Sequence, residues 1–486
     1  MRRPRTLALA VFTLLNVFTL VAGLTVARML PARLARLRIP VAAARPVVNA
    51  TPVLAPVPAS AAPEGSAAPA ARPTASGLAA VLGRALPSAQ TGAGVGIEVA
   101  DAQTGRVLYA DNAATPAAPA STAKLVTAAA SLAVLGPDAR FSTTVRQEGG
   151  TVVLVGGGDP TLAVNAYPSS DYPRPATLAK LAAATARVLK TQGRRSVRLG
   201  YDTALFGGPG IAPGWSAGDI TSGNVTSVVA LEADQGRLTP GGALEDDDDP
   251  VNYRPRATDP AGMTAAAFAS LLAQDGIAVS GSPRPTVAPA SAPALASVSS
   301  PPLVEILEQM LLESNNVIAE DLARHVAIAL GLPATFSGAA QALETELRRL
   351  GITTPISLVD GSGLSPRDAI APETLVRLLK VAADTPKLRG AITGLPVAGF
   401  TGTLSAGGSD FGGIGAIAGG TARGVVRAKT GNLSTVASLA GLAYDRAGLL
   451  LLFAIMAPQV PGAYQLQRAA NAIDAAAAGL AACGCS

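Results

Sequence analysis

Histidine is almost absent from this chain of 486 residues, and its scarcity excludes several kinds of active site. The one histidine, His325, is the only possible base for a Ser-His-Asp triad. It lies inside a helix-like run, residues 317–330, with no serine-elbow motif nearby, so we interpret it as structural. The sequence has no His-Glu-x-x-His motif and no cluster of metal ligands, and its glycine run at 156–158 lacks the Lys-Ser/Thr pair of a phosphate-binding loop. We therefore expect no metal and no cofactor.

Cysteine, aromatic and charged residues are scarce as well. Aromatics make up 3% and charged residues 15% of the chain, against 49% hydrophobic residues, so the core must be built from Ala, Val and Leu. The two cysteines, Cys483 and Cys485, form a Cys-Gly-Cys tail, and a catalytic body without cysteine suits an exported protein. A disulfide between them would close a small ring, which we interpret as a tail feature unrelated to catalysis. The net charge of +5 comes largely from N-terminal arginines, so we expect no nucleic-acid partner.

The N-terminal segment predicts export. Arg2, Arg3 and Arg5 precede an uncharged run, Leu7–Ala27, which is long enough to span a bilayer. A cleaved signal peptide is the alternative, but no clear Ala-x-Ala site follows at once. Both interpretations place the rest of the chain outside the cytoplasm, and we expect a retained membrane anchor. From Pro40 to Pro73, eight prolines amid Ala, Val and Ser predict an extended linker.

Three short motifs carry the chemistry of the chain. They are Ser121–Lys124 (STAK), Ser314–Asn316 (SNN) and Lys429–Gly431 (KTG), in that order. Together they match the Ser-x-x-Lys, Ser-x-Asn and Lys-Thr-Gly pattern of enzymes that acylate a serine with D-Ala-D-Ala peptides or β-lactams. Each motif alone also has an ordinary structural interpretation, as a helix N-cap, a helix-ending turn and a strand end. All three in order, each in a suitable context, indicate one active site.

The first motif supplies a nucleophile and its base. Ser121 stands where a helix should begin, because a good helix-former follows it up to Leu135 and stops at Gly136. Ser121 and Lys124 are three residues apart, so a helix places them on one face. A serine hydroxyl needs a base, and a lysine can serve when burial and a neighbouring cation lower its pKa. We expect Lys429 to be that cation.

The other two motifs complete the predicted site. Ser314 follows an amphipathic helix, residues 303–312, and we expect it to relay protons, while Asn316 orients Lys124 and the substrate amide. Lys429–Gly431 lies in a predicted edge strand that can pair with an extended peptide. Lys429 and Thr430 would hold the terminal carboxylate, and Gly431 would allow close approach. The backbone N–H groups of Ser121 and Asn432 would form an oxyanion hole.

Several longer sequence segments of the chain resemble those of a known family, the D-alanyl-D-alanine carboxypeptidase/endopeptidases. These are the class C low-molecular-mass penicillin-binding proteins. The resemblance runs from about Leu78 to the C-terminal helix. Besides the three motifs it rests on residues 157–162 (GGDPTL), 295–303 (LASVSSPPL), 360–365 (DGSGLS) and 395–399 (LPVAG).

The resemblance implies an α/β (α+β) fold. A transpeptidase/β-lactamase-like domain with a five-stranded antiparallel sheet, flanked by helices, would be split by a largely β insertion. The expected divisions are residues 1–30 for the anchor or signal, 31–77 for the linker, 78–140 and 291–482 for the two parts of the transpeptidase-like domain, 141–290 for the insertion and 483–486 for the tail. An acidic run, Glu245–Asp249, is expected to be a solvated loop rather than a calcium site.

The resemblance also implies substrate-binding residues. Asp202 looks like the aspartate that binds the amino group of a diaminopimelate side chain, with Phe206 as its aromatic companion; a plain turn aspartate is the alternative. Arg367 would hold a substrate carboxylate, although Pro366 makes its alignment less direct. The three residues that follow the third motif directly, Asn432, Leu433 and Ser434, would line the same subsite. Asn432 replaces the more common threonine, and residues 400–405 (FTGTLS) lack an arginine often found after the leucine.

The predicted function is that of an extracytoplasmic serine DD-peptidase. Ser121 would attack the D-Ala carbonyl of peptidoglycan stem peptides, and β-lactams would trap the acyl-enzyme. A serine β-lactamase is one alternative, but no Glu-x-x-x-Asn loop stands between the first two motifs. A catalytically silent cell-wall-binding protein on the same fold is another, and the intact set of motifs opposes it.

Overall fold

The computed structural model describes residues 72–166, 172–238, 254–405 and 420–485. All of them belong to the second of two units, residues 62–486. The predicted anchor, nearly all of the predicted linker and the acidic run Glu245–Asp249 lie outside the described residues. Among the helices that are described, none is both long enough and apolar enough to cross a bilayer.

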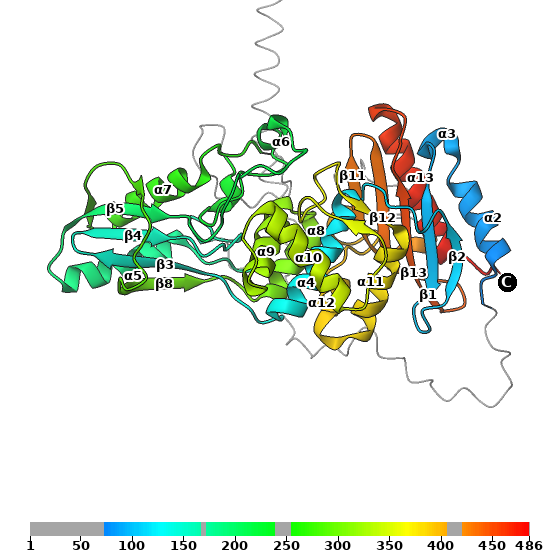
Figure 1. Ribbon diagram of the computed structural model, residues 1–486, viewed down its shortest axis with the longest axis horizontal. Coiled ribbons are helices and arrows are strands. Elements are labelled where there is room, and N and C mark those ends of the chain that lie inside the picture. The colour runs from blue at the N-terminus through cyan, green and yellow to red at the C-terminus, as the bar shows by residue number, and fades with distance from the viewer. Residues whose placement is uncertain (1–71, 167–171, 239–253, 406–419, 486) are drawn as a thin grey trace, which may run out of the picture. The chain divides into compact units, whose positions relative to one another are not determined.

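A five-stranded antiparallel sheet forms the centre of the main domain, as the resemblance to the family implied (Figure 1). The spatial order is β11-β12-β13-β1-β2, and every neighbouring pair is antiparallel. The strands are β1 (Gly96–Asp101), β2 (Val107–Asp111), β11 (Val426–Leu433), β12 (Val436–Tyr444) and β13 (Leu450–Ala457). The first two thus come from the N-terminal part of the chain and the other three from the C-terminal part.

Both faces of this sheet are buried, because successive residues of a strand point to opposite sides. In β13, Phe453 and Ile455 pack on one side and Leu452 and Ala454 on the other. The first side is covered by α2 (Ala75–Ala85) and α13 (Ala463–Ala481). The second side is covered chiefly by α4 (Lys124–Leu135), α8 (Leu303–Glu313), α9 (Asn316–Ala329), α10 (Phe336–Arg349) and α11 (Pro372–Asp384). Shorter elements of this domain are α3 (Ser88–Thr91), α12 (Gly390–Thr393), β9 (Ile356–Ser357) and β10 (Ala369–Ile370).

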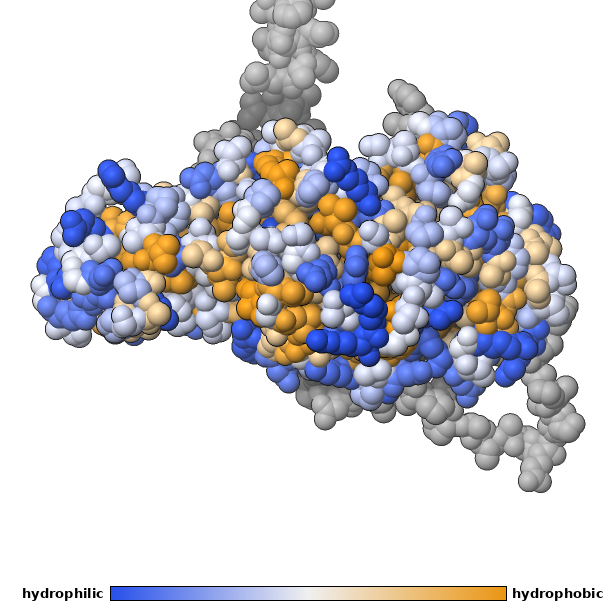
Figure 2. Space-filling model, viewed as in Figure 1, coloured by the Kyte–Doolittle hydropathy of each residue, from blue (hydrophilic) through white to orange (hydrophobic). Residues whose placement is uncertain are grey.

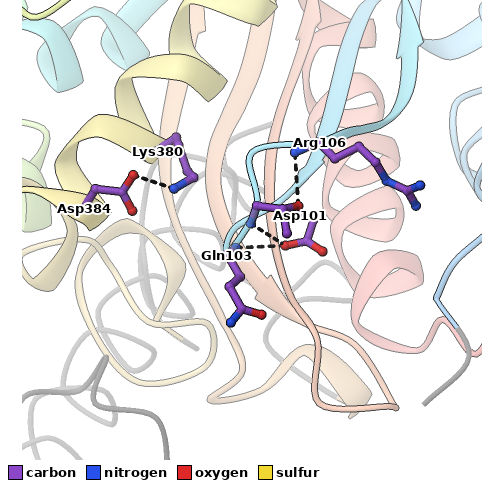
Figure 3. Close-up of polar contacts among 6 residues, drawn as sticks. Asp101, Gln103, Arg106, Lys380 and Asp384 are labelled. Carbon is purple, nitrogen blue, oxygen red and sulfur yellow. Dashed lines mark hydrogen bonds and ion pairs between the residues drawn. The ribbon is translucent and has the colours of Figure 1, made fainter. Parts of the chain in front are cut away.

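The turn between β1 and β2 shows why this hairpin forms. Asp101 Oδ1 accepts hydrogen bonds from the backbone N–H groups of Gln103 and Thr104, at 2.9 and 3.0 Å (Figure 3). Asp101 N also donates to Arg106 O, and Gly105 adopts a positive φ of 73°. An aspartate that caps its own turn, followed by a glycine in the left-handed region, is a strong hairpin signal. This turn joins β1 and β2 as neighbouring antiparallel strands.

The insertion is a mixed α/β unit. Its six-stranded sheet has the order β6-β5-β4-β3-β8, with β7 also paired to β5. The pairs β4/β5, β5/β6 and β5/β7 are parallel. The elements are β3 (Ser142–Glu148), β4 (Thr151–Val155), α5 (Leu178–Thr191), β5 (Ser196–Asp202), α6 (Ala217–Thr221), α7 (Pro260–Gln274), β6 (Ala278–Val279), β7 (Arg284–Pro285) and β8 (Ala294–Ser299).

Two expectations about the insertion need correction. It is not largely β, because α5 and α7 pack on one face of its sheet and share a core with β3, β4 and β5. It also ends later than residue 290, because β8 pairs with β3, with Ser299 opposite Ser142. The word at 295–303 is therefore partly a strand of the insertion. Parallel strands need crossover helices, which explains the helical content.

The surface carries few large apolar side chains. Figure 2 shows small orange groups among hydrophilic residues. The exposed large hydrophobic residues among those described are Val107, Tyr172, Leu205, Val287, Ile328, Phe400 and Tyr444. Cys483 and Cys485 form a disulfide, and Cys485 O accepts a backbone hydrogen bond from Thr74, so the tail packs against the start of α2.

Candidate active site

Ser121 lies in a tight turn at the entrance to a buried helix. The 3₁₀ turn η1 (Ala120–Ala123) leads directly into α4, whose first residue is Lys124. Lys124 Nζ lies 2.8 Å from Ser121 Oγ, so the predicted placement on one face is confirmed. Ala120 has a φ of +48°, which is uncommon for a residue with a side chain. Such local strain is often found at functional turns.

Lys124 is completely buried, and three oxygens surround its amine. Besides Ser121 Oγ, Nζ reaches Asn316 Oδ1 at 2.6 Å and the backbone oxygen of Ser362 at 2.8 Å. Both of these oxygens are acceptors only. When the amine is neutral, its two N–H bonds can serve them, which leaves the nitrogen lone pair for the Ser121 hydroxyl. The contacts of Lys124 thus fit a general base for Ser121.

The Ser362 carbonyl was not predicted, although it lies in the DGSGLS word at 360–365. Two buried carboxylates hold this loop in place. Glu320 accepts from the backbone N–H groups of Gly361 and Ser362, and Asp360 accepts from those of Ser362, Gly363 and Ser365. Burial, reinforced by the nearby Asp360, raises the pKa of Glu320 to about 8. These hydrogen bonds therefore hold the loop in the conformation in which the Ser362 carbonyl oxygen faces Lys124.

The second motif is a sharp connection between two helices. Helix α8 ends at Glu313, Ser314 adopts the left-handed conformation with a φ of 58°, and the Asn315 side chain caps α9 by accepting from Ile318 N. Asn316 is the first residue of α9. This geometry brings Asn316 to Lys124 and Ser314 Oγ to within 2.8 Å of Lys429 Nζ. Each predicted lysine thus meets a residue of the second motif.

The third motif lies in β11, at the edge of the five-stranded sheet, as predicted. Lys429 is fully buried and Thr430 is 1% exposed. A Cβ on Gly431 would lie 2.8 Å from Pro119 O and 3.0 Å from Ser121 N, so only glycine lets β11 lie this close to the Ser121 turn. Ser438 Oγ of β12 donates to Pro119 O at 2.6 Å and fixes the same turn from the next strand.

The predicted subsite residues beyond the third motif are accessible. Asn432 and Leu433 are half-buried, and Ser434 is exposed. Arg367 is also exposed, and its backbone N–H donates to Ser365 Oγ at the end of the DGSGLS loop. Each of these residues keeps some exposure to solvent, which a substrate-binding role requires.

Asp202 and Phe206 lie in the insertion, where each has partners of its own. Asp202 ends β5 of the inserted sheet, and its two carboxylate oxygens accept from Ala204 N at 2.8 Å and Ala288 N at 2.7 Å. The alternative of a turn aspartate fits these contacts. Phe206 packs edge-on against His325, with ring centroids 5.4 Å apart. His325 Nε2 makes a hydrogen bond with Gly158 O, and burial lowers its pKa to about 4, so its structural interpretation fits as well.

Several contacts at the site were not foreseen. Thr403 Oγ1 lies 2.9 Å from Thr430 Oγ1, and the inserted region reaches the second motif through Asn224 and Gln235. Trp215 Nε1 of the insertion donates to Asp360 Oδ2 at 2.7 Å. Nothing in the local sequence signals such pairings, because the partners are far apart in the chain. In the part of the chain that the structure describes, no group of three or more His, Cys, Asp or Glu residues could hold a metal.

These features define a class of protein. A buried Ser-x-x-Lys turn, a Ser-x-Asn connection and a Lys-Thr-Gly edge strand on a five-stranded antiparallel sheet are the parts of a serine acyl-transfer enzyme of the transpeptidase and β-lactamase type.

Comparison with known proteins gives the particular family. The sequence profile of the D-Ala-D-Ala carboxypeptidase 3 (S13) family matches residues 78–241 and 226–480. The carboxypeptidase DacB of Mycolicibacterium smegmatis is 38% identical over 86% of both chains. A D-alanyl-D-alanine carboxypeptidase of an Actinomadura species is 29% identical over 72% of this chain and 75% of its own. The chain therefore belongs to the D-Ala-D-Ala carboxypeptidase 3 (S13) family.

A solved structure supports the fold independently. Penicillin binding protein 4 of Haemophilus influenzae matches 81% of this chain and 98% of its own, with a TM-score of 0.64 and 23% identity. At that identity the likeness concerns the fold. It extends over both the main domain and the insertion, since 81% of this chain is more than the main domain alone contains.

Proposed function

We propose that Ser121 is the nucleophile with which this serine D-Ala-D-Ala carboxypeptidase acylates itself. The observation that carries the proposal is the position of the Lys124 amine, which lies within hydrogen-bond distance of two acceptor-only oxygens, on Asn316 and Ser362, and of the Ser121 hydroxyl. The substrate class is the D-Ala-D-Ala end of peptidoglycan stem peptides. β-Lactams act as covalent inhibitors that occupy the same serine.

The reaction follows from these positions. Lys124 takes the Ser121 proton as the oxygen forms a bond to the carbonyl carbon of the penultimate D-Ala. The oxyanion is held by the backbone N–H groups of Ser121 and Asn432. The C–N bond then breaks, and the proton that Lys124 took from Ser121 passes through Ser314 to the leaving D-alanine nitrogen, which leaves Lys124 neutral again. Ser314 Oγ lies 2.8 Å from Lys429 Nζ. Water subsequently attacks the ester carbonyl and restores the Ser121 hydroxyl.

The substrate would be aligned by the edge of the sheet. An extended peptide can pair with the second half of β11, because the backbone of residues 396–398 bridges the outer edge of this strand only near Arg427. Lys429 and Thr430 would hold the terminal carboxylate, and Arg367, Leu433 and Ser434 would contact the rest of the stem peptide. The resemblance suggested Asp202 and Phe206 for a diaminopimelate side chain. Asp202 accepts hydrogen bonds inside the insertion, and Phe206 packs against His325 of α9.

The decisive experiment follows the intact mass of the full chain in detergent after addition of benzylpenicillin. We expect a long-lived adduct that maps to Ser121, and loss of both the adduct and D-alanine release in Ser121→Ala. Ser131→Ala is the matched control, since Ser131 lies further along α4, buried and outside the site.

The alternatives give different results in the same experiment. An adduct that disappears within seconds would favour a β-lactamase, and no adduct on the wild-type chain would favour a silent cell-wall-binding protein. Full DD-peptidase activity of Ser121→Ala would overturn the proposal itself.

The family acts on the cell wall, so the catalytic part works outside the cytoplasm. We propose further that Leu7–Ala27 remains as a membrane anchor. The mass of the mature N-terminus tests this proposal. We expect the segment to be retained and the protein to sediment with membranes after a high-salt wash, whereas a mature chain that begins beyond residue 27 would show a cleaved signal.

A further inference from the structure

Two loops of the insertion touch the second motif, one on each of its asparagines. The backbone oxygen of Asn224 accepts from Asn316 Nδ2 at 2.8 Å, and Gln235 Oε1 accepts from Asn315 Nδ2 at 2.8 Å. These contacts join residues 92 and 80 positions apart in the chain. The insertion is therefore in direct contact with the catalytic centre, although it contributes none of the three motifs.

The contact from Asn224 decides which way the Asn316 amide points. An amide has one oxygen and one NH₂ group, and the two ends have opposite hydrogen-bonding character. Because a carbonyl oxygen takes the NH₂ end, the oxygen end faces Lys124 Nζ at 2.6 Å. With the amide reversed, its NH₂ group would face the Lys124 amine and compete for the lone pair that Ser121 requires. The Asn224 carbonyl thus determines that the amide oxygen of Asn316, and not its NH₂ group, faces Lys124.

The contact from Gln235 holds the neighbouring asparagine, which is fully buried and caps α9. Gln235 is itself 4% exposed, and its Nε2 donates to Pro160 O. Its backbone is in the left-handed region, with a φ of 53°, directly after Asp234 with a φ of 49°. Two successive left-handed residues that are not glycine are strained. Strain of this kind persists where a side chain must be aimed in one direction.

One buried arginine fastens the two loops together. Arg256 is 2% exposed, and its Nε donates to Gly223 O at 3.1 Å while its Nη1 donates to Gln235 O at 2.9 Å. The first acceptor immediately precedes Asn224, and the second is Gln235 itself. A planar guanidinium fixes two acceptors at a set spacing, which a lysine ammonium does less well. The position of each loop therefore depends on the other through Arg256.

We propose that Gln235 and Arg256 are positioning residues for acylation, through which the insertion orients Asn315 and Asn316 and thereby the Lys124–Ser121 pair. This inference rests on the proposed function, since it assigns the second motif a part in acylation. It gives the insertion a role in the rate of the chemical step, separate from any role in substrate choice. Neither residue touches the substrate in this scheme.

The test separates binding of a penicillin from the acylation step, using the full chain in detergent and stopped-flow kinetics. Gln235→Met keeps the length of the side chain but removes the acceptor for Asn315. We expect the first-order acylation constant to fall about 10- to 100-fold, while the non-covalent dissociation constant changes little, because small misplacements of reacting groups cost about that much. Gln235→Glu keeps an acceptor oxygen, so it should recover a large part of the rate.

Two further variants keep the test informative. Arg256→Lys retains the charge without the planar fork and should also slow acylation. Gln192→Met is the matched control, because Gln192 is exposed at the end of α5 and bonds Gln147 within the insertion. The melting temperature is measured for each variant, and rates are taken well below it, so that a loss of stability is not read as a loss of positioning.

The outcomes distinguish this inference from the proposed function. If the wild-type chain and Gln192→Met are not acylated at Ser121, the proposed function fails. If they are acylated and folded Gln235→Met reacts at the wild-type rate, the inference is overturned and the proposed function stands. Equal loss in Gln235→Met and Gln235→Glu would also overturn it, because the acceptor for Asn315 would then be irrelevant.

Discussion

Thr430 of the third motif lies against a second threonine, Thr403. Their hydroxyl oxygens are 2.9 Å apart, and Lys429 Nζ lies 3.5 Å from the Thr430 hydroxyl. A hydroxyl can donate one bond and accept others, so the position of the Thr430 proton depends on Thr403. If Thr430 holds the terminal carboxylate of the substrate, its donor must point outward. When Thr403 donates to Thr430, the Thr430 hydroxyl proton is available for the substrate carboxylate.

The exchange Thr403→Val removes this hydroxyl without changing the shape of the side chain. We expect KM for a stem peptide with a free terminal carboxylate to rise about 5-fold, the equivalent of one hydrogen bond of about 1 kcal/mol, with a smaller change in kcat. Steady-state kinetics of D-alanine release checks this. The control is Thr401→Val. The Thr401 hydroxyl accepts from Val397 N in the same loop, and its removal should leave KM unchanged. A KM that moves equally in both variants would mean that only the loop is affected.

At the scale of elements, the site depends on the approach of strand β11 to the η1 turn. Gly431 faces Pro119 and Ser121, and a Cβ there would meet Pro119 O, a backbone atom that has little freedom to move. Ser438 Oγ anchors the turn to β12. The distance between the nucleophile and the predicted oxyanion hole is therefore set by the absence of a side chain at one position.

Gly431→Ala should push β11 away from Ser121. We expect the acylation rate with benzylpenicillin to fall about 100-fold, because a displacement near 1 Å at the reacting groups costs that much. The control is Gly83→Ala in α2, where a Cβ meets nothing within 4 Å. That exchange should leave acylation unchanged and raise stability slightly, since alanine favours a helix over glycine. Wild-type acylation by Gly431→Ala would contradict the close approach.

At the scale of the whole molecule, the insertion and the main domain share buried carboxyl groups. Glu232 of the insertion is 3% exposed and Asp321 of α9 is 1% exposed. Burial raises the pKa of Glu232 from its ordinary 4.5 to about 8, although Arg256 and Arg237 act in the opposite direction. Burial, together with Glu232, raises the pKa of Asp321 as well. Burial thus shifts both groups toward the protonated form in the folded protein.

The stability of the protein should consequently fall as the pH rises. Between pH 4.5 and about 8 the folded state keeps the Glu232 proton while the unfolded state has lost it. The folded state then binds more protons, so the free energy of unfolding decreases with pH, by up to about 1.4 kcal/mol per unit for one carboxyl. The stabilising contribution of protonated Glu232 to the free energy of unfolding is complete below pH 4.5 and lost above about pH 8.

Glu232→Gln removes this titration. We expect its melting temperature to depend less on pH between 5 and 8 than that of the wild-type protein. Glu148→Gln, the same exchange at an exposed position of the insertion, should follow the wild-type curve. Differential scanning fluorimetry over this range checks the prediction, and parallel curves for all three proteins would contradict it.

Much of the site could be predicted from the sequence because its signals are local. The period of a helix predicts from their three-residue spacing that Ser121 and Lys124 share one face, and the sequence also predicts the edge strand that carries Lys429. Asp202 shows what the local sequence cannot predict. A strand-end aspartate that binds a substrate amine and one that binds its own turn have the same local sequence. The contact with Ala288 N, 86 residues away, favours the second interpretation.

The sequence by itself determined the nucleophile candidate, the order of the motifs and the elements that carry them, since these depend on neighbours within a few residues. Only the tertiary structure decided which groups complete the surroundings of Lys124 and the second motif. The Ser362 carbonyl, the Asn224 carbonyl and Gln235 reach them from loops distant in the chain. Two of these three contacts use backbone oxygens, which every residue type possesses. Their place can therefore be known only from the path of the folded chain.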